Sequence, residues 1–194
     1  MTDDIKKKWD QKYLEAEEQQ GTAVEVLLEN LHLLPRQGKA LELACGLGAN
    51  ALLLSEQGLD THAWDLSPVA IERLYRLAQG RKLHVHGEAR DILQQPPLPD
   101  SFDVIIASYF LDRALIPHIK NALRPHGLLF YQTFTQARVS NAGPQNEEFR
   151  LAENELLRLF SDFQIVVYRE EGRIGDLARG LRDEAYIVAQ KVSS

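Results

Sequence analysis

The sequence predicts a doubly wound α/β fold with seven strands. Short apolar runs alternate with segments of helical periodicity from residue 39 to residue 160, which is typical of parallel strands joined by right-handed crossovers. The run Phe102–Ala107 is almost continuously apolar, as in a strand whose sheet is covered on both faces. A turn containing Gly46 and Gly48 directly follows the first of these strands.

The composition indicates a globular protein with one domain. Of the 194 residues, 44% are hydrophobic and 26% are charged, which suffices for a sizeable core. The formal net charge of −6 argues against a large nucleic-acid footprint. The single cysteine, Cys45, excludes an intramolecular disulfide and fits a reducing compartment. Because the N-terminus is polar and no long apolar segment occurs, we expect no signal peptide, no membrane span and a cytoplasmic protein, while the oligomeric state stays open.

The first 34 residues are expected to form a helical cap over the rest of the chain. Ile5, Trp9 and Tyr13 fall on one face of a helix over residues 3–20. A second helix is expected over residues 22–32, with the threonine at its start as the cap.

The segment from Lys39 to Ala51 predicts a strand, a tight glycine turn and a helix. Glycines at Gly46 and Gly48 let the backbone approach a ligand closely, since they carry no side chain. The helix that follows points free N–H groups at the turn. Residues 44–50 are therefore the expected floor of a nucleotide-type site.

The remaining elements follow in regular alternation. In order, we expect a helix over 50–57, strands over 61–65 and 82–86 with a helix over 67–80 between them, the strand 102–107, a helix over 113–123, a turn over 124–127, a strand over 128–134, a polar loop over 136–151, a helix over 153–160, and strands over 164–168 and 185–190.

Ligands on doubly wound sheets bind beyond the carboxyl ends of the strands, near the switch in strand order. This rule places five residues on the expected site face, namely Gly46, Asp65, Asp91, Ser108 and Tyr109. Asp65 ends the second strand 17 residues after Gly48, where its carboxylate can accept both ribose hydroxyls. Asp91 and Ile92 follow the third strand, where a side-chain acceptor beside a backbone N–H could read an adenine edge.

With these residues the chain resembles the class I S-adenosylmethionine-dependent methyltransferases, which have a Rossmann-like sheet. The family's first motif, an acid followed by x-Gly-x-Gly-x-Gly, stands here as Glu42-Leu43-Ala44-Cys45-Gly46-Leu47-Gly48, with alanine at the first glycine. The segment 103–108 resembles the fourth motif, and 123–128 resembles the turn after it. The last two strands fit the family's closing antiparallel hairpin.

The resemblance implies S-adenosylmethionine as the methyl donor and S-adenosylhomocysteine as the product. It implies that the glycine turn holds the methionine part, Asp65 the ribose, and Asp91 with Ile92 the adenine. The cofactor-binding residues it predicts are Trp9, Tyr13, Glu42, Ala44, Cys45, Gly46, Gly48, Asn50, Asp65, Leu66, Asp91, Ile92, Ala107 and Ser108.

The resemblance covers residues 38–134, the expected cofactor-binding core, and leaves 135–194 as a lid loop, a helix and the closing hairpin. The opening Lys8-Trp9-Asp10-Gln11-Lys12-Tyr13 is similar to the N-terminal helix of the small tellurite-resistance-type and thiol-type methyltransferases. That similarity implies a helix that folds over the cofactor. A purely structural role, in which Trp9 and Tyr13 fix the helix to the core, is an equal alternative.

Gly46-x-Gly48-x-x-Ala51 also satisfies the dinucleotide fingerprint, so a nicotinamide-dependent oxidoreductase is one alternative. Glu42 argues against it, because a carboxylate beside a pyrophosphate is electrostatically poor but suits the cationic end of S-adenosylmethionine. A non-catalytic protein that binds S-adenosylmethionine and regulates a partner is a second alternative.

Other reactive side chains favour structural interpretations. Cys45 could act as a nucleophile, but no histidine is fixed beside it to activate the thiol. The simpler interpretation is a small residue packed in the turn. His84 and His86 point to one side of a strand, but the sequence shows no third ligand, and we predict no metal site.

The acceptor is expected to be a small molecule, a thiol or a chalcogen oxyanion, because no convincing general base is evident. Candidate residues for its pocket are Tyr109, Tyr131, Arg138 and Arg150, with packing and surface roles as equal alternatives. The absence of an Asn/Asp-Pro-Pro-aromatic motif after the fourth strand, at residues 107–110, argues against methylation of nucleobase amines.

Overall fold

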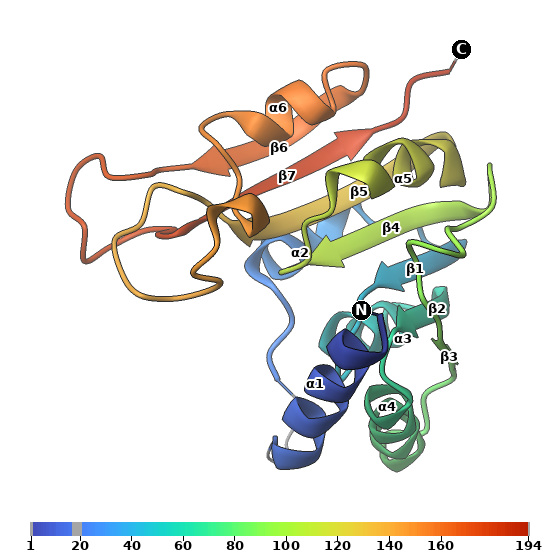
Figure 1. Ribbon diagram of the computed structural model, residues 1–194. Coiled ribbons are helices and arrows are strands. Elements are labelled where there is room, and N and C mark those ends of the chain that lie inside the picture. Colours follow the sequence, from blue (N-terminus) through green and yellow to red (C-terminus); the bar gives the residue numbers. More distant parts are fainter. Residues whose placement is uncertain (1, 17–20, 194) are drawn as a thin grey trace.

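A computed structural model describes residues 2–16 and 21–193, and its centre is a seven-stranded sheet in the order β3-β2-β1-β4-β5-β7-β6 (Figure 1). The strands are β1 (Lys39–Leu43), β2 (Asp60–Asp65), β3 (Val85–Ala89), β4 (Phe102–Ser108), β5 (Leu123–Phe134), β6 (Gln164–Glu170) and β7 (Glu184–Gln190). The first five run parallel, whereas β7 is antiparallel to both β5 and β6. The predicted doubly wound sheet with a closing antiparallel hairpin is confirmed.

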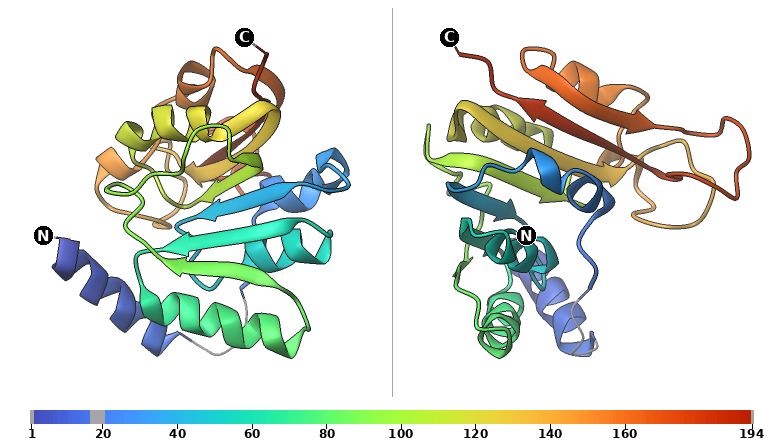
Figure 2. Two further views of the ribbon diagram at one scale, coloured as in Figure 1. Left: turned by 90° about the vertical axis from the view of Figure 1, so that its right-hand side faces the viewer. Right: turned by 180° about the vertical axis from the view of Figure 1, so that it is seen from behind.

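The helices lie on both faces of this sheet (Figures 1 and 2). They are α1 (Thr2–Glu15), α2 (Glu25–Glu29), α3 (Ala49–Glu56), α4 (Pro68–Gly80), α5 (Ile116–Ala122) and α6 (Glu155–Leu159), with short 3₁₀ turns at Leu31–Leu33, Arg113–Leu115 and Glu147–Phe149. No helix within the described ranges has the length and apolar character needed to cross a membrane.

Two apolar layers hold the helices against the sheet. On one face, α5 and α6 bury Ile119 and Leu156 against β1, β4 and β5. On the other face, α2 and α3 bury Leu27 and Leu54 against the opposite side of the same strands. Leu74 of α4 packs against α3 on this face. The strands of the centre are apolar on both sides because both of their faces are covered.

Local sequence signals set most of the boundaries. Helix α4 begins as predicted, because Ser67 Oγ accepts the N–H of Ala70 at 3.2 Å and Pro68 occupies the first turn. Strand β3 begins at Val85 rather than at residue 82, because Lys82 adopts a left-handed backbone with φ of 58° after the helix ends. The expected turn over 124–127 is an irregular part of β5, where the pairing with β4 shifts register.

The N-terminal helices are shorter than predicted. Helix α1 ends at Glu15, and the rest of the predicted helix over residues 17–20 lies outside the described residues. Helix α2 begins at Glu25 rather than at residue 22, because the chain is still extended at Val24, whose N–H donates to Asn50 Oδ1 at 2.9 Å. In the figures, α1 lies beside α4, at the β3 side of the sheet (Figures 1 and 2).

Two long loops, residues 136–146 and 171–183, project together from the same end of the sheet (Figure 1). Asp183 joins them, because its carboxylate accepts the backbone N–H groups of Val139 and Ser140 and the hydroxyl of Ser140. These hydrogen bonds lower the pKa of Asp183. The loops leave the sheet at the carboxyl ends of β5 and β6, on the side where α/β sheets bind ligands.

Candidate functional site

The glycine turn follows β1 with a left-handed backbone at three positions. Ala44, Gly46 and Gly48 have φ of 50°, 53° and 73°. Gly48 cannot be replaced without movement, because a Cβ built there would lie 2.4 Å from Leu74 Cδ1. Ala44 stands where the first-motif resemblance has glycine, and its left-handed backbone shows that this position has the geometry that glycine favours.

Glu42 lies beneath this turn and is almost fully buried, with 1% of its surface exposed. Its carboxyl oxygens accept Asn50 Nδ2 at 2.7 Å and the N–H of Ala51 at 2.8 Å. Burial raises its pKa to about 8, against the opposing effect of these two hydrogen bonds. At neutral pH the Glu42 carboxyl group is therefore largely protonated, and a neighbouring cation would favour its ionised form.

Asn50 connects three elements around the turn. Besides Glu42, its amide nitrogen donates to Ser108 Oγ at 3.1 Å, and its oxygen accepts the N–H of Val24. The end of β1, the end of β4 and the segment before α2 are thereby held at one point. Ala107 is fully buried beside Ser108 in β4, so its contribution to a ligand site would come from its backbone.

Asp65 ends β2 and faces the same turn. Its Oδ2 accepts the N–H of Gly46 at 2.8 Å and its Oδ1 accepts the N–H of Ser67 at 2.9 Å. Burial nevertheless raises its pKa, because only 5% of the residue is exposed. Leu66, the next residue, is partly buried at the same edge. Because a carboxylate offers about four acceptor sites, Asp65 keeps acceptor capacity for a ligand hydroxyl beside these hydrogen bonds.

The first helix reaches this site through Tyr13. A Cβ built on Gly46 would lie 3.1 Å from Tyr13 Oη, so the phenol lies directly on the turn. Burial and the nearby Asp65 carboxylate raise the pKa of Tyr13, which keeps it neutral. Trp9 stacks on Tyr13 with ring centroids 5.7 Å apart.

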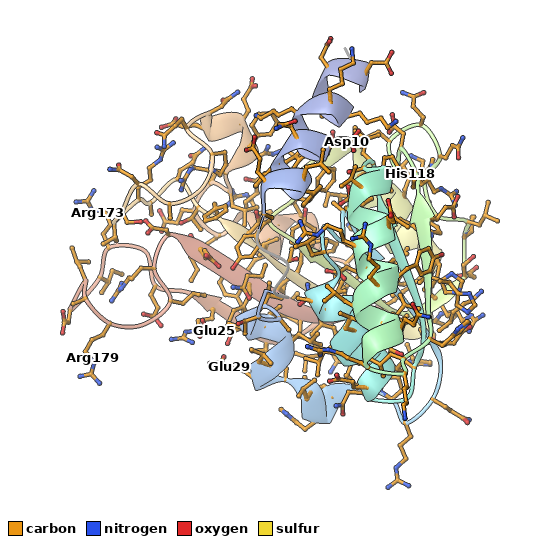
Figure 3. All side chains as sticks on the ribbon, turned by 90° about the horizontal axis from the view of Figure 1, so that it is seen from below. Asp10, Glu25, Glu29, His118, Arg173 and Arg179 are labelled. Atoms are coloured by element: carbon orange, nitrogen blue, oxygen red, sulfur yellow. The ribbon has the colours of Figure 1, made fainter. Side chains whose placement is uncertain are left out.

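Helix α1 is held in place by polar contacts to α4 and its cap. Arg73 of α4 donates to the backbone oxygens of Tyr13 and Ala16, at the carboxyl end of α1. Asp10 hydrogen bonds to the Ser67 hydroxyl, and Figure 3 shows Asp10 on the side of α1 that faces the body of the molecule. The helix is therefore fixed over the turn at its carboxyl end, whereas Ile5 nearer its start is 49% exposed.

Asp91 and Ile92 lie just after β3, beside the end of β2, since the N–H of Arg90 donates to the Asp65 backbone oxygen at 2.7 Å. Asp91 Oδ1 also shapes this loop by accepting the N–H of Leu93 at 3.0 Å. The Ile92 side chain is buried in the core, which leaves its backbone for recognition.

Cys45 is buried in the turn, and burial raises the pKa of its thiol well above the usual range. A thiol that stays protonated is a poor nucleophile. The structure therefore agrees with the interpretation of Cys45 as a small packed residue.

The acceptor-pocket candidates differ in their surroundings. Tyr109 is 49% exposed beyond the end of β4, has a left-handed backbone and packs against Phe134 with centroids 5.1 Å apart. Tyr131 is buried and donates its hydroxyl to the Phe110 backbone oxygen at 2.6 Å. The structure gives Tyr131 a packing role and leaves Tyr109 available to a ligand.

The two arginine candidates hold the loop 136–146 rather than face a pocket. Arg150 is fully buried, and its guanidinium donates to the backbone oxygens of Thr135, Ala142 and Pro144. Arg138 donates to the side chain and backbone oxygens of Gln145. An acceptor contact through Arg150 would require the loop to open, so the expectation for this residue is replaced by a structural role.

Gln132 and Glu184 belong to this edge and were not predicted. Gln132 is buried at 2% exposure, accepts the N–H of Val26 at 2.7 Å and donates to Glu184 Oε2 at 2.7 Å. Burial raises the pKa of Glu184, and Tyr109 lies beside it. The sequence signal that could have identified Gln132 is its polar side chain within the mostly apolar run 128–134.

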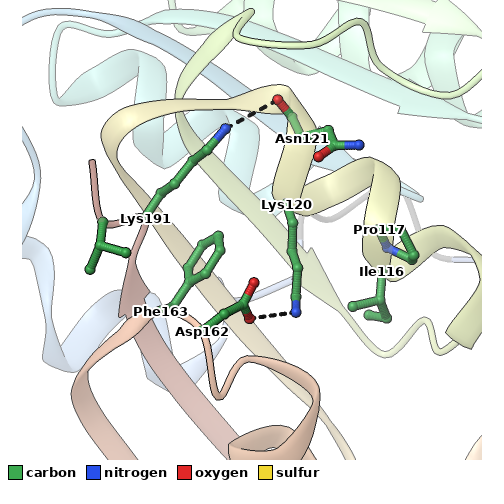
Figure 4. A pocket seen from close by; sticks show the side chains of 8 residues that line it. Ile116, Pro117, Lys120, Asn121, Asp162, Phe163 and Lys191 are labelled. Atoms are coloured by element: carbon green, nitrogen blue, oxygen red, sulfur yellow. Dashed lines mark hydrogen bonds and ion pairs between the residues drawn. The ribbon is translucent and has the colours of Figure 1, made fainter. Parts of the chain in front are cut away.

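A hollow of about 460 Å³ lies elsewhere, between α5 and the segments after α6 and β7 (Figure 4). It is crossed by an ion pair from Lys120 to Asp162 at 2.5 Å and by Lys191, which donates to the Asn121 backbone oxygen at 3.4 Å. This hollow lies at the amino end of β5, where Lys191 pairs with Gly127, and it contains none of the predicted site residues.

Comparison with known proteins decides between the families that share this turn. A family model described as "Tellurite resistance protein TehB" matches residues 6–188. The chain belongs to the TehB family. The resemblance to class I S-adenosylmethionine-dependent methyltransferases of the tellurite-resistance type is thus confirmed.

Among curated relatives of this TehB-family chain, "Probable S-adenosyl-L-methionine-dependent methyltransferase TehB" of Haemophilus influenzae is 28% identical over 138 residues, which is 68% of this chain and 48% of the relative. "Hemagglutinin 1" of Eikenella corrodens is 31% identical over 141 residues, 68% of this chain and 46% of the relative. The chain spans about half the length of the curated relatives it matches.

Solved structures share the fold. TehB from Haemophilus influenzae superposes with a TM-score of 0.71 at 22% identity. The match covers 94% of this chain and 67% of the TehB chain. Geranyl diphosphate C-methyltransferase from Streptomyces coelicolor, solved with Mg²⁺, geranyl diphosphate and S-adenosyl-L-homocysteine, has a TM-score of 0.72 at 13% identity and covers 98% of this chain and 97% of its own.

Proposed function

We propose that this chain transfers the methyl group of S-adenosylmethionine to a small acceptor. The observation that carries the proposal is the pair of buried acids, Glu42 and Asp65, on either side of the left-handed glycine turn. Two acids near one turn favour a ligand with positive charge over a pyrophosphate. Membership in the TehB family supports the same donor.

The residues present fit this cofactor. At Gly46 and Gly48 an added side chain would meet Tyr13 and Leu74, so the tight packing of the turn against α1 and α4 requires glycine at both positions. Asp65 would hold the ribose, Asp91 and the backbone of Ile92 the adenine. When bound, the sulfonium supplies an already activated methyl group.

The chain's own task is then alignment and exclusion of water, which is catalysis by proximity and orientation. Tyr13, fixed over the turn by the docking of α1, covers one side of the site. Tyr109 and Phe134 form the aromatic edge where the acceptor would enter. A thiolate or a chalcogen oxyanion is the proposed acceptor, because such groups are nucleophilic without a general base.

Calorimetric titration with S-adenosylmethionine, S-adenosylhomocysteine and NAD tests the donor. We expect micromolar binding of the first two and none of NAD. Binding of NAD alone would exclude the proposal. The variant D91A should weaken cofactor binding, whereas D91N, which keeps an acceptor for the N–H of Leu93, should weaken it less. D100A, an exposed acid in the following loop, serves as the matched control.

Turnover tests the acceptor. Incubation with S-adenosylmethionine and a thiol, tellurite or selenite should yield S-adenosylhomocysteine and a methylated product detectable by mass spectrometry. Binding without turnover on any of these acceptors would instead favour the regulatory protein that only binds S-adenosylmethionine. Loss of turnover in Y109A with unchanged cofactor affinity would place the acceptor at the aromatic edge.

A further inference from the structure

A cluster of metal-ligand side chains lies away from the turn, in the amino-terminal halves of β2 and β3. His62 and His86 are direct neighbours in the parallel pairing of these strands, and Asp60 lies two residues before His62. Strands β2 and β3 are adjacent at one side of the sheet (Figure 1). Because the glycine turn faces the carboxyl ends of the strands, this cluster is separate from the proposed methyl-transfer site.

The three side chains converge on one point. The Asp60 carboxylate lies 3.1 Å from His86 Nε2 and 3.8 Å from His62 Nε2. The imidazole rings stack with centroids 4.7 Å apart, and each ring presents its Nε2 to the Asp60 carboxylate. One ligand atom from each residue lies within 4.8 Å of the other two. In a tetrahedral zinc site with bonds of about 2.0–2.1 Å, donor atoms lie about 3.3 Å apart, close to these separations.

One nitrogen of the cluster has no partner among the described residues. His62 Nε2 is buried, and no hydrogen bond to it is formed, since 3.8 Å from Asp60 is beyond hydrogen-bond length. A buried polar atom without a partner carries a free-energy cost, and in native proteins it usually has one, often a water or an ion. A plain ion pair between Asp60 and His86 satisfies one imidazole only and leaves this cost in place.

We propose that Asp60, His62 and His86 bind a divalent transition-metal ion, with Zn²⁺ as the best match. Two imidazoles and one carboxylate are borderline donors that suit Zn²⁺ better than Mg²⁺ or Ca²⁺, which prefer oxygen. The fourth position is left to water. The ion would join β2 to the outer strand β3.

The site is open to solvent on one side. The side chains of Asp60 and His86 are 52% and 45% exposed, while that of His62 is 21% exposed, so an ion can enter from the Asp60 side. Lys39 lies near, over the ring of Phe102 at 5.8 Å, and its charge opposes a bound cation. Removal of that charge in K39M should therefore tighten metal binding.

Titration of the untagged full chain with Zn²⁺ tests the proposal, with a chromophoric chelator as competitor. We expect one equivalent to bind with micromolar affinity, and at least roughly tenfold weaker binding in D60N and in H86A, in line with the loss of one ligand. H118A is the matched control, since His118 is an exposed histidine on α5 and does not belong to the cluster. Co²⁺ as a probe should give visible absorption bands that H86A abolishes.

Folding is monitored separately. His86 and Asp60 are exposed, so their variants should unfold at nearly the wild-type temperature without metal. Zn²⁺ should raise the unfolding temperature of the wild type and of H118A, but not of H86A, because only the folded chain assembles the three ligands. Absence of saturable Zn²⁺ binding in the wild type would overturn the proposal, as would binding that D60N and H86A leave unchanged.

Discussion

Ala44 has an unusual backbone for a residue other than glycine, with φ of 50°. A left-handed conformation costs a non-glycine residue about 1–2 kcal/mol, part of which glycine would lose again through its greater freedom when unfolded. We expect A44G to raise the free energy of unfolding by up to about 1 kcal/mol, measured by urea denaturation. In A51G, where the residue is helical, the same change should lower the free energy of unfolding by about 1 kcal/mol. A change of the same sign in both variants would contradict the argument.

Glu42 gives the fold a distinct pH dependence. Its pKa is about 8 in the folded chain against 4.5 in the unfolded chain, so the folded chain binds the extra proton between these values. Its contribution to stability is fully present below about 4.5 and is lost as the pH rises through about 8. We expect the difference in unfolding free energy between wild type and E42Q to shrink over this range, measured by denaturation at several pH values.

The same acid links cofactor binding to protons. A cation beside Glu42 favours its ionised form and lowers its pKa. Binding of S-adenosylmethionine at pH 7 should therefore release protons, detected by calorimetry in two buffers of different protonation enthalpy. E42Q should bind without this release. An unchanged proton release in E42Q would assign the effect to another group, with Asp65 as the next candidate.

At the scale of elements, Asn50 joins the end of β1, the end of β4 and the start of α2. N50A would leave the Val24 N–H and the Oε1 atom of the buried Glu42 without a hydrogen-bond partner. Each such loss costs about 1–3 kcal/mol, so we expect unfolding free energy to fall by about 2–4 kcal/mol. N141A, at an exposed loop position, should change it by less than about 0.5 kcal/mol. Thermal and urea unfolding of the two variants measure the contrast.

Helix α1 is attached chiefly through its carboxyl end, where Arg73 donates to two backbone oxygens. Loss of these charged hydrogen bonds should release α1 while the sheet stays folded. Because 1.4 kcal/mol is a factor of ten and such bonds contribute about 1.5–3 kcal/mol each, R73A should be cleaved by trypsin within α1 at least about tenfold faster.

The matched control for this cleavage is R76A. Arg76 lies on the same helix, and the ion pair it forms within the described residues is with Glu72, with 64% of its side chain exposed. Its removal should leave cleavage of α1 unchanged. S-adenosylmethionine should slow cleavage in the wild type if α1 covers the cofactor, and equal rates with and without it would restrict Tyr13 and Trp9 to a packing role.

The sequence predicted elements well where a local signal sets them and less well where a distant contact does. Ser67 and Pro68 identify the start of α4 without any tertiary knowledge. Val24, by contrast, is held extended by Asn50, which lies 26 residues away, so the start of α2 was placed too early. Arginine is usually a surface residue, so nothing in the sequence indicated that Arg150 lies in the interior. Its burial depends on the folded loop, which brings three backbone oxygens to its guanidinium group.

At the scale of the whole molecule, strand polarity predicted the location of the site but not the side-chain contacts that depend on the register between strands. The rule that ligands bind at carboxyl ends placed Asp65 beside Gly46, and the structure joins them by a hydrogen bond. The metal-ligand cluster escaped prediction because it depends on register. His86 meets His62 and Asp60 only when β2 and β3 align as they do, and no pattern within either strand contains that alignment.

The opposite ends of the sheet should respond differently to the cofactor. S-adenosylmethionine at 100 times its dissociation constant stabilises the folded chain by about 2.7 kcal/mol, and amides that open locally near the ligand gain most of that protection. Hydrogen exchange followed by mass spectrometry should therefore show slower exchange in peptides over 44–52, 65–67, 90–94 and α1.

Peptides that line the hollow of Figure 4, at 116–121 and 162–163, provide the internal reference. They lie at the amino end of β5, so their local opening should not depend on a ligand at the carboxyl ends of β1 and β2. Protection confined to this hollow would move the cofactor site to the opposite end of the sheet, and it would leave the buried acids Glu42 and Asp65 without a ligand to explain them.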